Sequence, residues 1–157
     1  MTKKLLPYLL ASVVFLSACA TQQKTAGGKG GVAHAVRTTA YTQSEPGGSH
    51  DAMGHRLTCG KLNSAAADWS RFPLGTKFKI LSTGEVFQVN DYGSALIGTN
   101  TIDLYKNSRV AMRQWGVRHV DIQILEWGSA EKSLQVLAPR AHNPKVRRMI
   151  SGLQKNS

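Results

Sequence analysis

The chain has 157 residues and a formal net charge of +11, from 20 Lys and Arg against 9 Asp and Glu. Eighteen N-terminal residues have the features of a signal peptide, and the 139 residues behind them are enough for one domain and too few for two. The basic balance indicates an anionic partner, and an exported protein is expected to meet a cell-wall polymer or a lipid surface rather than nucleic acid.

The N-terminus begins with Lys3 and Lys4, followed by an apolar run over residues 5–18. As a helix this run rises about 21 Å, too little to cross a hydrocarbon core of about 30 Å, so it is typical of a signal peptide and not of a membrane span. It ends in Leu16-Ser17-Ala18-Cys19, which resembles the lipobox of bacterial lipoproteins. The alternative is an ordinary cleaved signal that happens to contain a cysteine.

The resemblance implies a signal peptide over residues 1–18 and a lipid on Cys19, which becomes the mature N-terminus. Residue 20 is Ala and not Asp, which by the same resemblance implies anchoring in the outer membrane, facing the periplasm. Residues 19–33 hold four glycines and predict a lipidated flexible tether. An acylated Cys19 leaves Cys59 without a disulfide partner, and we expect Cys59 to be a buried structural thiol.

Residues 34–128 are expected to form one domain made mainly of strands. Alternating apolar residues predict strands over 34–41, 77–81, 85–89, 101–105 and 120–124, with a hairpin turn at 82–84 and a long loop over 42–55. Asn107 or Ser108 can cap a short helix that runs through Trp115 and stops at Gly116. These elements predict a mainly all-β fold, a small barrel or sandwich with one short helix.

Residues 129–157 continue behind this domain with a weaker hydrophobic pattern. They include a stretch from Pro139 onward with five Lys and Arg and no acid. We expect a solvated basic C-terminal tail, helical in part from Pro144, which could adhere to murein or to lipid headgroups.

Three segments of the domain each carry an aspartate beside a strand end or a glycine-bearing turn. The aspartates are Asp68, Asp91 and Asp103, in the segments 66–76, 89–98 and 101–105. A single aspartate in such a place is usually a turn residue that bonds local backbone. The three segments stand out together, and with the ordered resemblance given next they predict a shared polar site.

The order of these segments resembles the three-aspartate (3D) domain, a double-psi β-barrel found in membrane-bound lytic transglycosylase A and rare lipoprotein A. The family's sequence runs through Pro-Leu-Gly-Thr, Asp-Thr-Gly-Gly-Ala-Ile-x-Gly and Ile-Asp-Leu/Val-Tyr, and this chain matches it at 73–76, 91–98 and 102–105. The resemblance extends over about 36–126 and implies a six-stranded double-psi barrel. Two segments depart from the family: Trp69 replaces a Pro, and Asp91-Tyr92-Gly93-Ser94 replaces Asp-Thr-Gly-Gly.

The resemblance implies peptidoglycan glycan strands as the partner and cleavage of the MurNAc–GlcNAc bond with a 1,6-anhydro product. Cleavage needs an acid that stays protonated near neutral pH, and burial or a second carboxylate can provide one. The resemblance assigns that role to Asp91. Asp68 and Asp103 are expected to tune it, and the expected sugar contacts are Tyr41, Tyr92, Tyr105 and Trp69.

Other interpretations remain open. The protein could be a non-catalytic wall-binding or wall-loosening module, like the related expansin barrels, and the altered loop at Asp91 favours that alternative. It could also be a structural envelope protein whose basic surface binds an anionic polymer. His50, Asp51, His55 and Cys59 have no common metal spacing, so we expect no metal and no cofactor. We expect a monomer.

Overall fold

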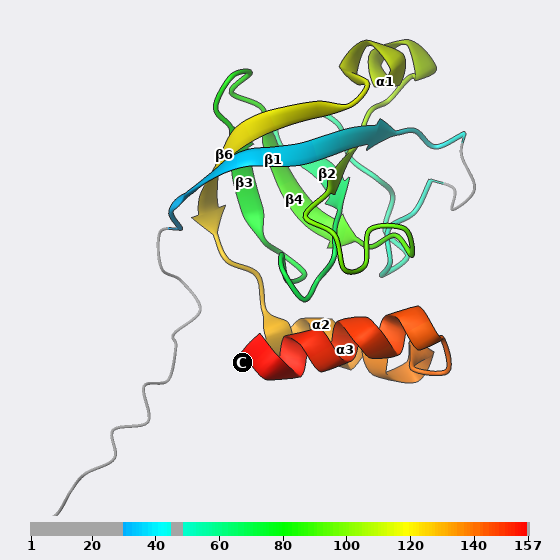
Figure 1. Cartoon of the computed structure of the whole chain (residues 1–157). Helices are drawn as coiled ribbons and strands as arrows, with labels where there is room; N and C mark the ends of the chain where they lie inside the picture. The colour runs from blue at the N-terminus through cyan, green and yellow to red at the C-terminus, as the bar shows by residue number, and fades with distance from the viewer. Residues whose placement is uncertain (1–29, 45–48, 157) are drawn as a thin grey trace, which may run out of the picture.

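The computed structural model describes residues 30–44 and 49–156, and most of them belong to one closed six-stranded β-barrel (Figure 1). The strands follow one another around the barrel in the order β1-β5-β2-β4-β3-β6. This confirms the predicted mainly-β, six-stranded barrel. The strands are β1 (Val32–Tyr41), β2 (Asn63–Ala66), β3 (Lys77–Ile80), β4 (Val86–Asp91), β5 (Ile102–Tyr105) and β6 (Arg118–Glu126).

The barrel mixes parallel and antiparallel pairs. β1 pairs in parallel with β5, and β2 pairs in parallel with β4, whereas the four remaining pairs are antiparallel. The two strands of each parallel pair are not consecutive in the chain, because at least one other strand lies between them in the sequence. This arrangement is consistent with the double-psi barrel that the sequence implied.

The interior of the barrel is formed by alternating strand residues. Phe78 and Ile80 of β3 and Phe87 and Val89 of β4 are fully buried, and the rings of Phe78 and Phe87 stack at 5.6 Å. Burying a side chain of this size stabilises the fold by about 1.5–3 kcal/mol. The lysines that alternate with them on β3 lie at the surface side, so period-two patterning predicted both arms of this hairpin correctly.

Helix α1 (Arg109–Trp115) has the ends that the sequence predicted. The Ser108 hydroxyl accepts a hydrogen bond from the Ala111 amide, and Gly116 ends the helix at φ 62°. Trp115 brings the helix onto the barrel, because its indole N–H donates to Thr38 Oγ1 at 3.2 Å. Helix α1 therefore covers the end of the barrel next to β1.

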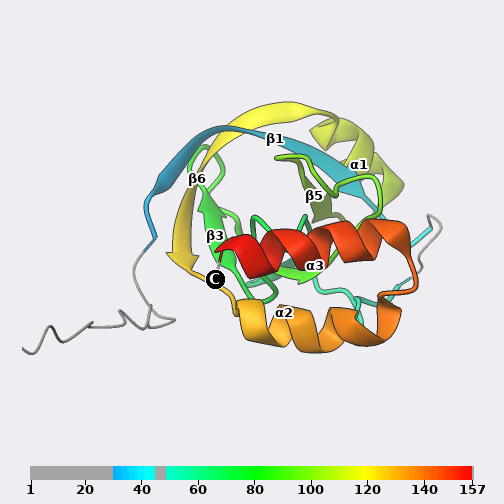
Figure 2. The same cartoon turned by 60° about the horizontal axis from the view of Figure 1, so that its bottom comes forward.

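The C-terminal segment forms two further helices that pack on the barrel (Figure 2). They are α2 (Ala130–Leu137) and α3 (Pro144–Asn156), joined through the short 3₁₀ helix η1 (Ala138–Arg140). The prediction of one short helix is therefore wrong, since the part of the chain that the structure describes has three. The expected solvated tail is also corrected: its apolar side chains enter the core, and the buried ones are Leu137, Val146, Met149 and Leu153.

Strand β2 (Asn63–Ala66) is an element that the sequence analysis did not predict. All four of its residues are buried, so no alternation of polar and apolar residues marks it. It lies between β4 and β5 and forms the centre of the region described below.

The predicted signal peptide over 1–18, the predicted lipidation of Cys19 and the predicted tether up to residue 29 lie outside the described residues. The last two residues of the expected tether, Val32 and Ala33, begin strand β1. Among the helices within 30–44 and 49–156, none has both the length and the apolar character needed to cross a membrane.

Candidate functional site

Asp91 and Asp103 lie on the two strands that flank β2. Asp91 ends β4, Asp103 is the second residue of β5, and both are in register with Ala66 of β2. Neighbouring strands are about 4.8 Å apart, so the two backbone positions are separated by roughly 10 Å. The parallel pairing of β2 with β4 therefore brings together two of the three predicted acids.

Asp91 is held partly out of water, and this raises the pKa of its carboxyl group from 3.8 to about 6. Burial is the main cause, and the charge of Asp51 adds to it. The Tyr92 amide, which donates to Asp91 Oδ1 at 2.8 Å, opposes the rise, as do the positive charge of Arg140 and the Ala52 amide. A carboxyl group with a pKa of about 6 is protonated in about half of the molecules at pH 6 and in about a tenth at pH 7, which leaves a protonated population that can act as a general acid.

Tyr41 lies within the electrostatic reach of both acids. Burial raises the pKa of its phenol above the ordinary value, and the charges of Asp91 and Asp103 raise it further, so the phenol stays protonated. Its hydroxyl is buried and has no hydrogen-bond partner among the described residues. The Tyr41 hydroxyl therefore keeps an unused donor proton close to the two acids.

Asp103 and Tyr105 are fixed by strand β1. The Thr39 hydroxyl donates to Asp103 Oδ1 at 2.5 Å, and the Tyr105 ring packs against Tyr41 with centroids 5.5 Å apart. Tyr105 is only 5% exposed, so its ring supports Tyr41 and offers little surface to a ligand.

Asp68 has a different place from the other two acids. Its carboxylate is 2% exposed and accepts three hydrogen bonds, from the Ser70 amide and hydroxyl and from the Gly98 amide at 2.6 Å. Asp68 therefore fastens the loop that follows Asp91 to the turn over 68–72, and its expected tuning of Asp91 stays a prediction.

Trp69 is also reassigned by the structure. Its side chain is fully buried, so its ring presents no face to a sugar. Instead its indole N–H donates to the Asp91 carbonyl at 2.8 Å, and its ring meets Tyr92 edge-on at 5.1 Å. Trp69 thus fixes the backbone of the loop that carries Asp91, while the half-buried Tyr92 retains some exposed surface.

Two residues near Asp91 were missed or misjudged from the sequence. Asp51 is 8% exposed and accepts hydrogen bonds from the Met53 and His55 amides, which orders the loop over 49–57 beside the site. Asx turns give a local signal for such a residue, but the sequence analysis weighed Asp51 only as a metal ligand. Arg140 arrives from η1, and no sequence pattern connects it to Asp91.

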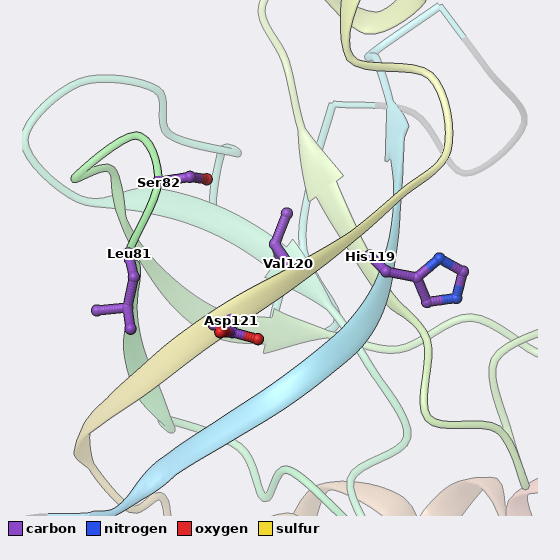
Figure 3. Close-up of a pocket in the computed structure, with 5 residues that line it drawn as sticks. All are labelled: Leu81, Ser82, His119, Val120 and Asp121. Carbon is purple, nitrogen blue, oxygen red and sulfur yellow. The ribbon is translucent and has the colours of Figure 1, made fainter.

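The remaining candidates lie apart from this site. Cys59 is exposed, which corrects the expectation of a buried thiol. Across the described ranges, no three His, Cys, Asp or Glu side chains gather in a way that could hold a metal ion. A shallow hollow lies between the β3–β4 turn and β6, where His119 points away from Leu81 and Ser82 (Figure 3). None of the predicted site residues lines it.

The fold and the acids define a mixed six-stranded barrel with a carboxyl group of raised pKa beside its central strand. Residues 63–126 match the family described as the 3D domain, and this stretch runs from β2 to β6. This module is found in peptidoglycan-associated proteins such as membrane-bound lytic transglycosylase A. A search of curated proteins gave no match. Strand β1, the 49–57 loop and helices α2 and α3 lie outside the matched region.

Proposed function

We propose that this protein cleaves peptidoglycan glycan strands as a lytic transglycosylase, with Asp91 as the acid. The observation that carries the proposal is the pKa of Asp91 near 6, in a site that also holds Tyr41 and Asp103. The 3D domain supports the choice of substrate, because it occurs in a lytic transglycosylase that acts on this polymer.

One carboxyl group is sufficient for the reaction. Asp91 gives its proton to the glycosidic oxygen as the bond from that oxygen to MurNAc C1 breaks and the electron pair stays on the oxygen. The MurNAc C6 hydroxyl oxygen then bonds to C1, and its proton passes to the Asp91 carboxylate. Asp91 ends as it began, and no water is consumed, so the product carries a 1,6-anhydro ring.

Two other side chains have defined parts in this scheme. The protonated Tyr41 hydroxyl donates a hydrogen bond to a sugar oxygen between the acids. Asp103, held by Thr39, accepts one from a sugar hydroxyl. Tyr92 supplies the partly exposed aromatic surface for a sugar ring.

The alternative is a module that binds the wall without cleaving it. It is favoured by the loop sequence Asp91-Tyr92-Gly93-Ser94, which departs from the family's Asp-Thr-Gly-Gly. Such a module would use the same surface and would need no titrating acid.

Incubation of the full chain, purified in detergent, with isolated sacculi distinguishes the two functions. Mass spectrometry of the soluble products should show anhydro-muropeptides, which are one water lighter than reducing ends. Asp91→Asn should abolish them, whereas Asp121→Asn, in the hollow of Figure 3, should not. Binding to sacculi without any products would refute the enzyme and support the module, and reducing ends would indicate a hydrolase.

We also propose that a lipid on Cys19 anchors the protein in the outer membrane. Residues 20–31 separate Cys19 from strand β1, and 12 residues can span at most about 43 Å, which would keep the barrel near its membrane. Cys19→Ala should move the protein from the detergent phase to the aqueous phase on phase separation. Unchanged partition would refute the anchor.

A further inference from the structure

Arg140 brings a positive charge from the C-terminal helices to the acid site. It ends η1, 49 positions after Asp91 in the chain and outside the matched region. One guanidinium nitrogen, Nη2, donates to the Ala52 carbonyl at 2.5 Å. The other, Nη1, lies 3.5 Å from the Tyr92 hydroxyl, and the Arg140 Cζ atom lies 5.8 Å from the centre of the Tyr92 ring.

The two attachment points of Arg140 lie on the two loops beside Asp91. Ala52 directly follows Asp51 in the ordered loop over 49–57. Tyr92 directly follows Asp91, and its amide donates to the Asp91 carboxylate. The guanidinium therefore joins these two loops, and it does so within the electrostatic reach of the Asp91 carboxyl group.

The charged and titratable groups around Asp91 and Tyr41 come from four different elements. Asp51 belongs to the 49–57 loop, Tyr41 to β1, Asp103 to β5, and Arg140 to η1. His55, whose Nδ1 lies 3.6 Å from Asp51 Oδ2, adds a further titratable side chain on that loop. Arg140 is the one permanent cation in this set.

We infer that Arg140 is a positioning residue of the acid site: it clamps the 49–57 loop to Tyr92 and sets the electrostatic balance at Asp91 against the neighbouring carboxylates. The inference rests on the proposed function for its consequence in catalysis, but the clamp itself can be measured without any activity. Without the guanidinium, burial and Asp51 act on Asp91 with less opposition, so the carboxyl group holds its proton to higher pH.

An arginine suits this place better than a lysine. The planar guanidinium group presents several N–H donors at once, so one nitrogen can donate to the Ala52 carbonyl while another lies beside the Tyr92 hydroxyl. The positive charge is delocalised over both nitrogens. A lysine ammonium could supply the charge from one point but could not make both attachments in this geometry. Arg140→Lys and Arg140→Gln therefore separate the charge from the clamp.

The test is a titration of the Asp91 carboxyl carbon by NMR in the full chain, with Arg140→Gln, Arg140→Lys and a control. The control is Arg147→Gln, because the Arg147 side chain donates to the Ala141 and His142 carbonyls, in the turn just before α3. Arg140→Gln should raise the Asp91 pKa by about half a unit to one unit, as expected for loss of one nearby charge. Arg140→Lys should raise it less, and Arg147→Gln should leave it unchanged.

Two further readouts complete the experiment. Amide exchange over residues 52–55 should accelerate in both Arg140 variants, because each loses the fork that holds the Ala52 carbonyl. In the sacculus assay the alkaline limb of the pH profile should move to higher pH in Arg140→Gln by the same amount as the NMR pKa.

An unchanged Asp91 pKa and unchanged amide exchange in a folded Arg140→Gln would overturn the inference. If the pKa moves as expected while the wild-type protein gives no products from sacculi, the positioning role stands and the proposed cleavage fails. The two failures are thus distinguishable.

Discussion

Replacement of Asp91 by asparagine tests the electrostatics of the site through stability. Asp91 titrates at about 6 in the folded protein and at 3.8 in the reference state. The folded state therefore holds this proton over a pH range in which the unfolded chain has already released it. The contribution of Asp91 to stability is fully present below the unfolded pKa and is lost as the pH rises through the folded pKa.

The size of this loss follows from the two pKa values. At about 1.4 kcal/mol per pKa unit, their difference corresponds to about 3 kcal/mol. Water reaches part of the Asp91 carboxyl group, so we expect roughly half of that value to be observed. The amide side chain of the Asp91→Asn variant does not ionise, so the variant shows no such loss.

Urea denaturation of the wild type and of Asp91→Asn is the appropriate assay. The free energy of unfolding of the variant, relative to wild type, should increase by roughly 1–2 kcal/mol between about pH 4 and about pH 8. A difference that does not depend on pH would refute the raised pKa. A relative stability of the variant that falls with rising pH would mean that the folded protein lowers the Asp91 pKa instead.

Three further predictions concern the surroundings of the site. Asp68→Ala should lower the free energy of unfolding by about 3–5 kcal/mol in denaturant titrations, because it leaves three donors unpaired, and a loss below about 1 kcal/mol would contradict its fastening role. Met149→Ala should cost about 2–5 kcal/mol in the same titrations, whereas a solvated tail would tolerate the change without measurable cost. Cys59 should react with a maleimide in the native protein as fast as in the denatured protein, and labelling only after denaturation would show that the thiol is covered.

Residues that follow a local rule were predictable from the sequence. Phe78 and Ile80 alternate with lysines, and this alternation was sufficient to predict the hairpin. Ser108 and Gly116 mark the two ends of α1, and these capping residues were sufficient to predict the helix. The resemblance to the 3D domain added the closure of six strands. Asp91 and Asp103 could be grouped in advance because each stood in a recognisable segment.

The features that could not be predicted from the sequence depend on contacts between distant parts of the chain. The buried strand over 63–66 has no alternation, and α3 hides its three buried side chains among many basic residues. Asp68 and Trp69 are neighbours in the sequence and lie just before the Pro73–Thr76 motif. In the folded protein both are buried and hold the loop that carries Asp91. Arg140 reaches that loop only through the fold of α2 and α3, which no local pattern shows.

The position of β1 in the barrel has a consequence for how the protein folds. β1 lies between β5 and β6, so residues 32–41 find their partners only in the segment 102–126. The first strand in the chain therefore has no partner until β5 is available, and ring closure must wait for β6, at the end of the barrel sequence. Such non-local pairing makes folding slow, on the order of milliseconds to seconds. In a chain that emerges N-terminus first, β1 would stay unpaired until β5 and β6 have emerged. The barrel would then close by pairing its last strand with its first.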